Sequence, residues 1–81
     1  METKMITLDL LKPGEKAIIR GFNGIGAETS YLMELGLLIG TPVKMIKFAP
    51  FGDPLEICFR DYHLSIRRSV AGSIFVAKEE T

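Results

Sequence analysis

The sequence predicts a small all-β domain: a five-stranded SH3-like barrel with one short helix between its first and second strands. Residues that favour turns, chiefly Gly, Pro, Asn and Asp, recur along the chain at the short intervals expected of a small barrel. The segment 55–60 alternates apolar and polar residues, as a strand with one buried face does. With 81 residues there is room for a single domain, 1–81, whose core we expect at about 5–77.

The five strands are predicted between these turns. The first runs over 16–22 and leads through the glycine-containing connection 23–26 into a helix at 27–35. The remaining strands are predicted at 43–48, 55–60, 63–66 and 73–77. A single helical turn at 67–72, with Ser69 as its N-cap, separates the last two strands.

The helix at 27–35 is predicted to pack through one face. At about 100° per residue, its apolar positions form a stripe along one side. The residues expected to face the core are Ala27, Tyr31, Leu32 and Leu35, and those expected to face away are Thr29, Ser30, Met33 and Glu34. Gly36 follows where a left-handed C-terminal cap is needed. The residues expected to determine the fold are Leu32, Leu35, Gly36 and Gly40.

The charge balance and the cysteine count limit the functions that the chain can have. Ten Lys and Arg residues balance ten Asp and Glu residues, whereas nucleic-acid binders gather a basic excess, so nucleic-acid binding is not expected. Zero net charge also removes one barrier to self-association, which leaves a homo-oligomer open. A single cysteine cannot form an internal disulfide, and no apolar run approaches the roughly 20 residues of a membrane span. Because the N-terminus lacks the features of a secretory signal, we expect a cytoplasmic protein.

Residues able to carry chemistry are few. Catalysis needs a nucleophile, a base or a metal in a defined arrangement, and no such arrangement is evident, so enzyme activity is not expected. Gly24 and Gly26 precede the helix without the third glycine and the lysine of phosphate-binding motifs. Cys58 and His63 lie across a predicted hairpin turn and are the candidate ligands for a weakly bound Fe(II) or Zn(II). The stronger interpretation is a surface histidine and a half-buried cysteine, because two donors fall short of a dedicated site.

The loop 49–54 carries most of the candidate partner-binding residues. Its apolar side chains either fold over the mouth of the barrel or form an exposed docking patch, and the sequence leaves both open. The candidate contacts are Pro50, Phe51 and Pro54, together with Met33 on the predicted outward face of the helix. Arg67 and Arg68 are interpreted as a solvated pair beside a turn, with contact to an anion or an acidic partner as the alternative.

Four motifs occur in order along the chain. They are 8–15, which ends in Lys-Pro-Gly-Glu; 32–40, Leu-Met-Glu-Leu-Gly-Leu-Leu-Ile-Gly; 49–55, Ala-Pro-Phe-Gly-Asp-Pro-Leu; and 64–71, Leu-Ser-Ile-Arg-Arg-Ser-Val-Ala, followed by Ile74 and Val76. In this order and spacing they resemble the FeoA family of bacterial ferrous-iron transport accessory proteins, over about residues 5–77. The chain departs from the family pattern at Tyr31, where Arg is usual, and at Ile39, where Pro is usual. It also departs at Asp61, where Gly is usual because the hairpin turn favours a positive φ.

The resemblance implies an SH3-like adaptor of ferrous-iron uptake. Its implied partner is FeoB, the Fe(II) permease with a cytoplasmic GTP-binding region, on which the adaptor would dock and which it would modulate. It implies a cytoplasmic protein that lies at the inner face of the membrane when bound and touches the membrane only through this partner. Two alternatives follow from the residues themselves. One is a small transition-metal-binding protein that uses Cys58 and His63, and the other is a generic SH3-like module that binds peptides or nucleic acid.

Overall fold

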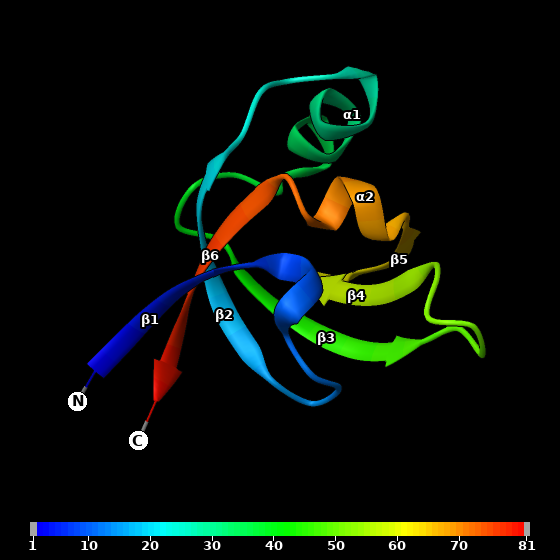
Figure 1. Cartoon of the computed structure of the whole chain (residues 1–81). Helices are drawn as coiled ribbons and strands as arrows, with labels where there is room; N and C mark the ends of the chain where they lie inside the picture. The colour runs from blue at the N-terminus through cyan, green and yellow to red at the C-terminus, as the bar shows by residue number, and fades with distance from the viewer. Residues whose placement is uncertain (1, 81) are drawn as a thin grey trace.

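Six strands form one antiparallel sheet in the order β1-β6-β2-β3-β4-β5 (Figure 1). The structure, a computed structural model, describes the backbone of residues 2–80 and the side chains of residues 4–78. The elements are β1 (Glu2–Thr7), the 3₁₀ helix η1 (Leu8–Leu10), β2 (Lys16–Phe22), α1 (Ala27–Leu35), β3 (Pro42–Phe48), β4 (Leu55–Phe59), β5 (Tyr62–Ile66), α2 (Arg68–Ala71) and β6 (Ile74–Glu80). Register shifts in the β2–β6 and β3–β4 ladders bend these strands, so the sheet curls around the core with α1 and α2 at one end.

The all-β class is confirmed, but the predicted number of five strands is wrong. The additional strand is β1, which pairs antiparallel with β6 and places Ile6 opposite Val76. Its sequence mixes charged and apolar residues, and its partner strand lies at the other end of the chain. Strand formation here depends on that long-range pairing, which a local pattern does not report.

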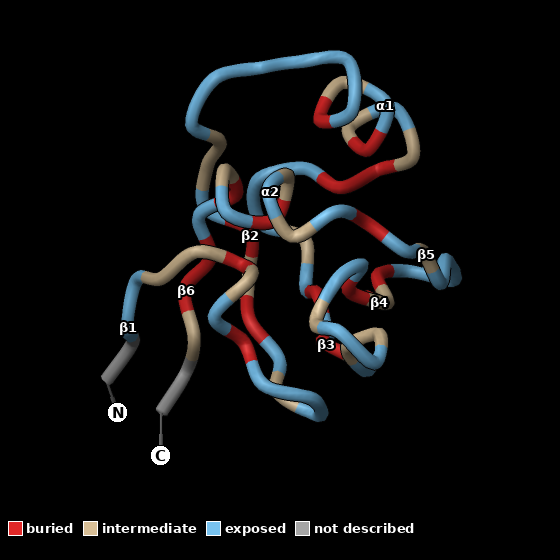
Figure 2. The backbone as a smooth tube through the Cα atoms, turned by 45° about the vertical axis from the view of Figure 1, so that its right-hand side comes forward, coloured by how far each residue is buried: buried red, intermediate tan, exposed pale blue. Residues whose placement is uncertain are grey.

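The core is drawn from every part of the sheet and from the segments that connect its strands. Figure 2 shows buried residues recurring at intervals along the strands and in both α1 and α2. The largest fully buried side chains are Phe59, Leu8, Leu11, Ile19, Leu37, Met45, Leu55, Ile57, Ile74, Val43 and Val76. In β4 the predicted alternation is confirmed, because Leu55, Ile57 and Phe59 are buried while Glu56 and Cys58 are half-buried.

Helix α1 has the predicted limits but a different buried face. Leu32 is buried and Leu35 half-buried, as expected, whereas Ala27 and Tyr31 are exposed and Thr29 is only 5% exposed. The row that faces the core therefore contains Thr29 and Leu32, three residues apart. A polar side chain is tolerated there because the Thr29 hydroxyl donates to the Gly26 carbonyl and accepts from the Gly26 N–H.

The C-terminus of α1 ends in the predicted left-handed glycine. Gly36 has a φ of 111°, its N–H donates to the Met33 carbonyl, and the Leu37 N–H donates to the Leu32 carbonyl. These two bonds form a Schellman motif, and Leu37 is fully buried behind it. Gly40 also has a positive φ, of 96°, and its N–H donates to the Ile19 carbonyl, which ties the turn after α1 to β2.

The β4–β5 hairpin supplies the positive charge that α1 lacks at its own C-terminus. Arg60, rather than Asp61, is the residue of this turn with a positive φ, of 53°, so that part of the turn prediction is wrong. The Arg60 side chain lies over Gly36, and a cation placed there complements the partial negative charge of the helix end.

A charged contact joins the turn before β2 to β6. Glu15 accepts the Lys12 N–H at 2.7 Å and pairs with the Lys78 ammonium at 2.5 Å. The bond from Lys78, followed by that from the Lys12 N–H, holds the pKa of Glu15 below its ordinary value. Because a lowered carboxyl pKa favours the folded state above the unfolded pKa, this contribution is present at neutral pH and is lost as the pH falls through the folded value.

We expect Gly36→Ala to lower the free energy of unfolding by roughly 1–3 kcal/mol, measured by urea denaturation. Alanine would have to adopt the left-handed backbone conformation of Gly36. Its methyl group would lie 2.8 Å from an Arg60 guanidinium nitrogen. Gly14→Ala is the matched control, since Gly14 has a φ of 90° but nothing within 4 Å of the added carbon. The control should cost less, and an equal loss in both variants would show that contact with Arg60 contributes nothing.

Candidate functional site

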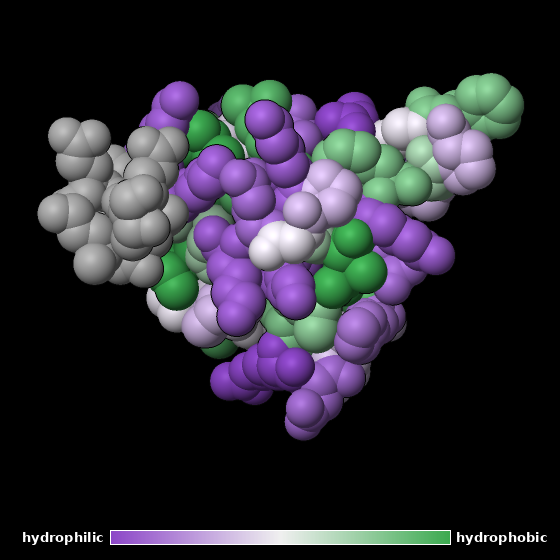
Figure 3. Space-filling view, turned by 90° about the horizontal axis from the view of Figure 1, so that it is seen from below, coloured by the Kyte–Doolittle hydropathy of each residue, from purple (hydrophilic) through white to green (hydrophobic). Residues whose placement is uncertain are grey.

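The β3–β4 loop carries a fully exposed aromatic side chain at its tip. Phe51 is 99% exposed, and Pro50 and Pro54 beside it are exposed as well. In Figure 3 apolar atoms project at the right-hand end of the molecule, where Figure 1 places this loop. Of the two alternatives left open by the sequence, the structure therefore shows the exposed arrangement, and Phe51 does not cover the mouth of the barrel.

Arg68 fixes the base of this loop. Its Nε donates to the Gly52 carbonyl at 2.9 Å, and its Nη1 donates to the Asp9 carbonyl at 3.2 Å. The guanidinium also lies over the ring of Phe48, with its carbon 5.1 Å from the ring centre. Arg68 is thus a structural residue, and its interpretation as half of a solvated pair is wrong, whereas its neighbour Arg67 is exposed.

A backbone hydrogen bond between α2 and the same loop explains how α2 begins. The carboxylate of Asp53 accepts the backbone N–H of Arg68 at 2.9 Å, in the way that an N-cap side chain would. The residue at the N-cap position is Arg67, and Ser69 lies inside the helix, so the prediction of Ser69 as the cap is wrong. No local pattern predicts this arrangement, because the capping carboxylate comes from a loop 15 residues earlier.

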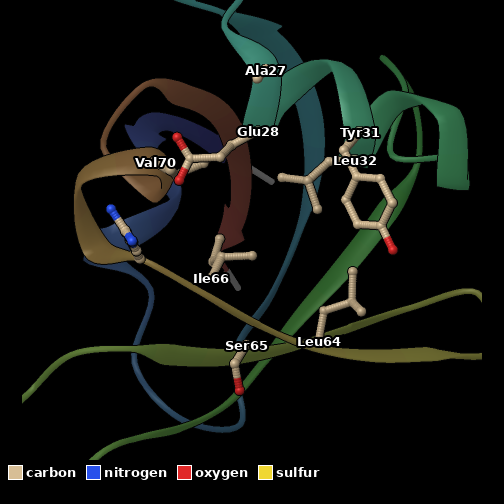
Figure 4. Close-up of a pocket in the computed structure, with 9 residues that line it drawn as sticks. Ala27, Glu28, Tyr31, Leu32, Leu64, Ser65, Ile66 and Val70 are labelled. Atoms are coloured by element: carbon tan, nitrogen blue, oxygen red, sulfur yellow. The ribbon is translucent and has the colours of Figure 1, made fainter.

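A second surface feature is a groove of about 390 Å³ between α1 and β5. Its walls include Glu28, Tyr31 and Leu32 from α1, Leu64, Ser65 and Ile66 from β5, and Arg67 and Val70 from the segment that follows. Figure 4 shows Leu32 pointing between the two walls, with Tyr31 and Leu64 toward one end and Glu28 toward the other. The groove was not predicted from the sequence, because Tyr31 was expected to face the core and is instead exposed.

Cys58 and His63 lie across the β4–β5 turn, as predicted, and the register of the two strands sets them directly opposite each other. His63 Nδ1 is 3.7 Å from a carboxylate oxygen of Glu56, which lies on the same outer face. Within the described side chains, no group of three or more His, Cys, Asp or Glu residues is arranged to hold a metal ion. The pair therefore supplies two donors, fewer than a dedicated site requires.

Met33 is half-buried on α1, and Figure 1 places α1 and the β3–β4 loop on different sides of the molecule. Met33 and Phe51 therefore do not form a single patch. None of the helices in residues 2–80 is long and apolar enough to cross a membrane.

We expect Arg68→Ala to lower the free energy of unfolding by about 2–3 kcal/mol, because it leaves the Gly52 and Asp9 carbonyls without their charged donor. Arg67→Ala is the matched control on the neighbouring, exposed arginine, and it should change stability by less than about 0.5 kcal/mol. Thermal and urea unfolding of the two variants make the comparison. Equal stability in both would mean that the contacts of Arg68 add nothing to the fold.

Comparison with solved structures supports the fold and the resemblance. The FeoA protein of Chlorobium tepidum is 36% identical to this chain, with a TM-score of 0.85 over 90% of this chain and 70% of that one. The zinc-complexed FeoA of Stenotrophomonas maltophilia, described as a prokaryotic SH3 domain protein, is 27% identical, with a TM-score of 0.75 and 88% of each chain covered. The SH3-like architecture is thus shared with FeoA proteins.

Sequence comparison leads to the same family. A fusion of Fe(2+) transport protein A with the Fe(2+) transporter FeoB, from Porphyromonas gingivalis, is 32% identical over 69 residues. These residues make up 85% of this chain and 8% of the fusion, so the chain spans a small part of that relative. A family model for the FeoA domain matches residues 6–78, which include all four motifs noted in the sequence. The chain therefore belongs to the FeoA family, whose members are small accessory domains of ferrous-iron transport and not enzymes.

Proposed function

We propose that this protein is a cytoplasmic adaptor that docks on the cytoplasmic GTP-binding region of a FeoB-type permease and modulates it. The observation that carries the proposal is the fusion relative, in which the region similar to this chain and a FeoB transporter share one polypeptide. Covalent linkage holds two domains at high effective concentration, an arrangement typical of parts that act together. The proposed contact is the tip of the β3–β4 loop, centred on Phe51.

The loop has the physical properties of a binding anchor. An exposed aromatic ring offers a large apolar area that a partner can enclose, and such residues dominate many interfaces. Pro50 and Pro54 restrict the backbone, and Arg68 holds Gly52, so little conformational entropy remains to be lost on docking. Met33 would make a separate and weaker contact, since part of its side chain is already buried.

A weak Zn(II) or Fe(II) site at Cys58 and His63 is a second candidate. It is favoured by the direct cross-strand pairing of the two side chains and by the zinc bound to the Stenotrophomonas relative. With two donors, the coordination would be completed by water or by a second copy of the chain, so the affinity should be weaker than micromolar. Calorimetry with each metal measures it. Sub-micromolar affinity that is lost in both Cys58→Ser and His63→Ala would instead make metal binding the main function.

We expect Phe51→Ala to weaken binding to the cytoplasmic region of the permease by about tenfold, that is by roughly 1–2 kcal/mol. The melting temperature should hardly change, because the side chain is 99% exposed. Ile39→Ala, on an apolar residue that is 66% exposed in the turn after α1, is the control and should bind normally. Calorimetry and melting curves on the same samples test the proposal, and equal affinity for all three proteins would refute it.

A further inference from the structure

Strand β5 forms one edge of the sheet and pairs only with β4. The two-residue turn between them is closed by the pair Phe59 and Tyr62, so alternate residues of β5, beginning with Tyr62, bond to β4. By the same alternation, the backbone N–H and C=O groups of His63 and Ser65 point away from β4. Among the described residues, none of the turn and loop hydrogen bonds involves 62–66. The edge therefore presents free backbone donors and acceptors, which are a template for another strand.

The groove between α1 and β5 adjoins this edge. Its volume, about 390 Å³, falls within the range of about 300–1,000 Å³ typical of ligand sites. On one wall Tyr31 is 57% exposed, and on the other Leu64 is half-buried, with Leu32 between them (Figure 4). An apolar side chain placed here would cover surface that the domain itself leaves open to water.

The charges of the groove narrow the choice of occupant. Glu28 and Arg67 both line it, both are exposed, and neither belongs to an ion pair among the described side chains. One carboxylate and one guanidinium carry no net charge together, so a segment without net charge complements them better than a polyanion does. A helix would satisfy its own backbone groups and leave those of His63 and Ser65 unpaired, whereas an extended chain would bond to them.

We propose that β5 accepts an extended segment of a partner polypeptide as an additional strand. The backbone of the segment bonds to His63 and Ser65, and one bulky apolar side chain packs between Tyr31 and Leu64. The segment carries no net charge where it passes Glu28 and Arg67. This surface is separate from the β3–β4 loop, so the inference goes beyond the docking proposed above and does not depend on it.

The test uses threonine-based heptapeptides with an acetylated N-terminus and an amidated C-terminus. The peptides differ from one another only in the central residue. Binding is followed on the whole protein by nitrogen–proton NMR. Peptides with a central Leu or Phe should shift the amide signals of His63 and Ser65 and slow their hydrogen exchange, while a central Asp or Gly should not. Methylating the peptide nitrogens that face β5 should weaken binding by about tenfold or more, while methylating the alternate nitrogens should leave it unchanged.

Protein variants locate the contact. Tyr31→Ala should weaken peptide binding several-fold, and Phe51→Ala, on the other surface, should not affect it. Ser65→Pro removes an outward N–H without removing a bond to β4, so it should abolish binding while the β4–β5 pairing persists. If this variant does not fold, the N-methylated peptides still decide, because they leave the protein unchanged. Equal effects of both methylation patterns, or no peptide with a Kd below about 1 mM, would overturn the proposal.

Discussion

The guanidinium of Arg68 joins α2 to two segments that are distant in sequence, η1 and the stretch formed by the end of β3 and the β3–β4 loop. Its side chain donates to the carbonyls of Gly52 and Asp9 and lies over the ring of Phe48. Its backbone N–H donates to the carboxylate of Asp53. A half-buried charge is costly unless its donors are satisfied, and charge-assisted bonds to carbonyls offset that cost. The position of the β3–β4 loop against η1 and α2 therefore depends on the contacts of Arg68.

This arrangement separates the apolar surface that builds the fold from the apolar surface that is free to bind. A chain of 81 residues buries only about 60% of the surface that it exposes when unfolded, and its large core side chains come from the strands, η1, α1 and the segments that connect them. Phe51 can remain outside because the loop is held by hydrogen bonds rather than by packing of its tip. Along β5, the open edge and the exposed Tyr31 leave a second region uncovered. The chain thus leaves two separate surfaces open to binding.

Local patterns predicted some elements well and others poorly, for physical reasons that particular residues illustrate. The alternation of Leu55, Ile57 and Phe59 predicted β4, and Gly36 predicted the end of α1, because both signals act over a few residues. The prediction of the buried face of α1 was wrong. The Thr29 hydroxyl forms its hydrogen bonds with Gly26 and can therefore be buried, while Tyr31 stays exposed. Strand β1 and the role of Arg68 could not be predicted, because each depends on contacts with segments distant in the chain. Phe51 was one of the candidate partner contacts named from the sequence, but only the structure shows that its side chain is exposed.

We expect Arg68 to hold the β3–β4 loop in one conformation before any partner binds. Nitrogen relaxation measured on the free protein tests it most directly, through the order parameters of the Phe51 and Gly52 amides. We expect order parameters near those of rigid backbone, about 0.85, in the native chain, and clearly lower values in Arg68→Ala. Values below about 0.6 in the native chain would show a loop that moves on the nanosecond timescale, and would contradict the claim that it is prepared for docking.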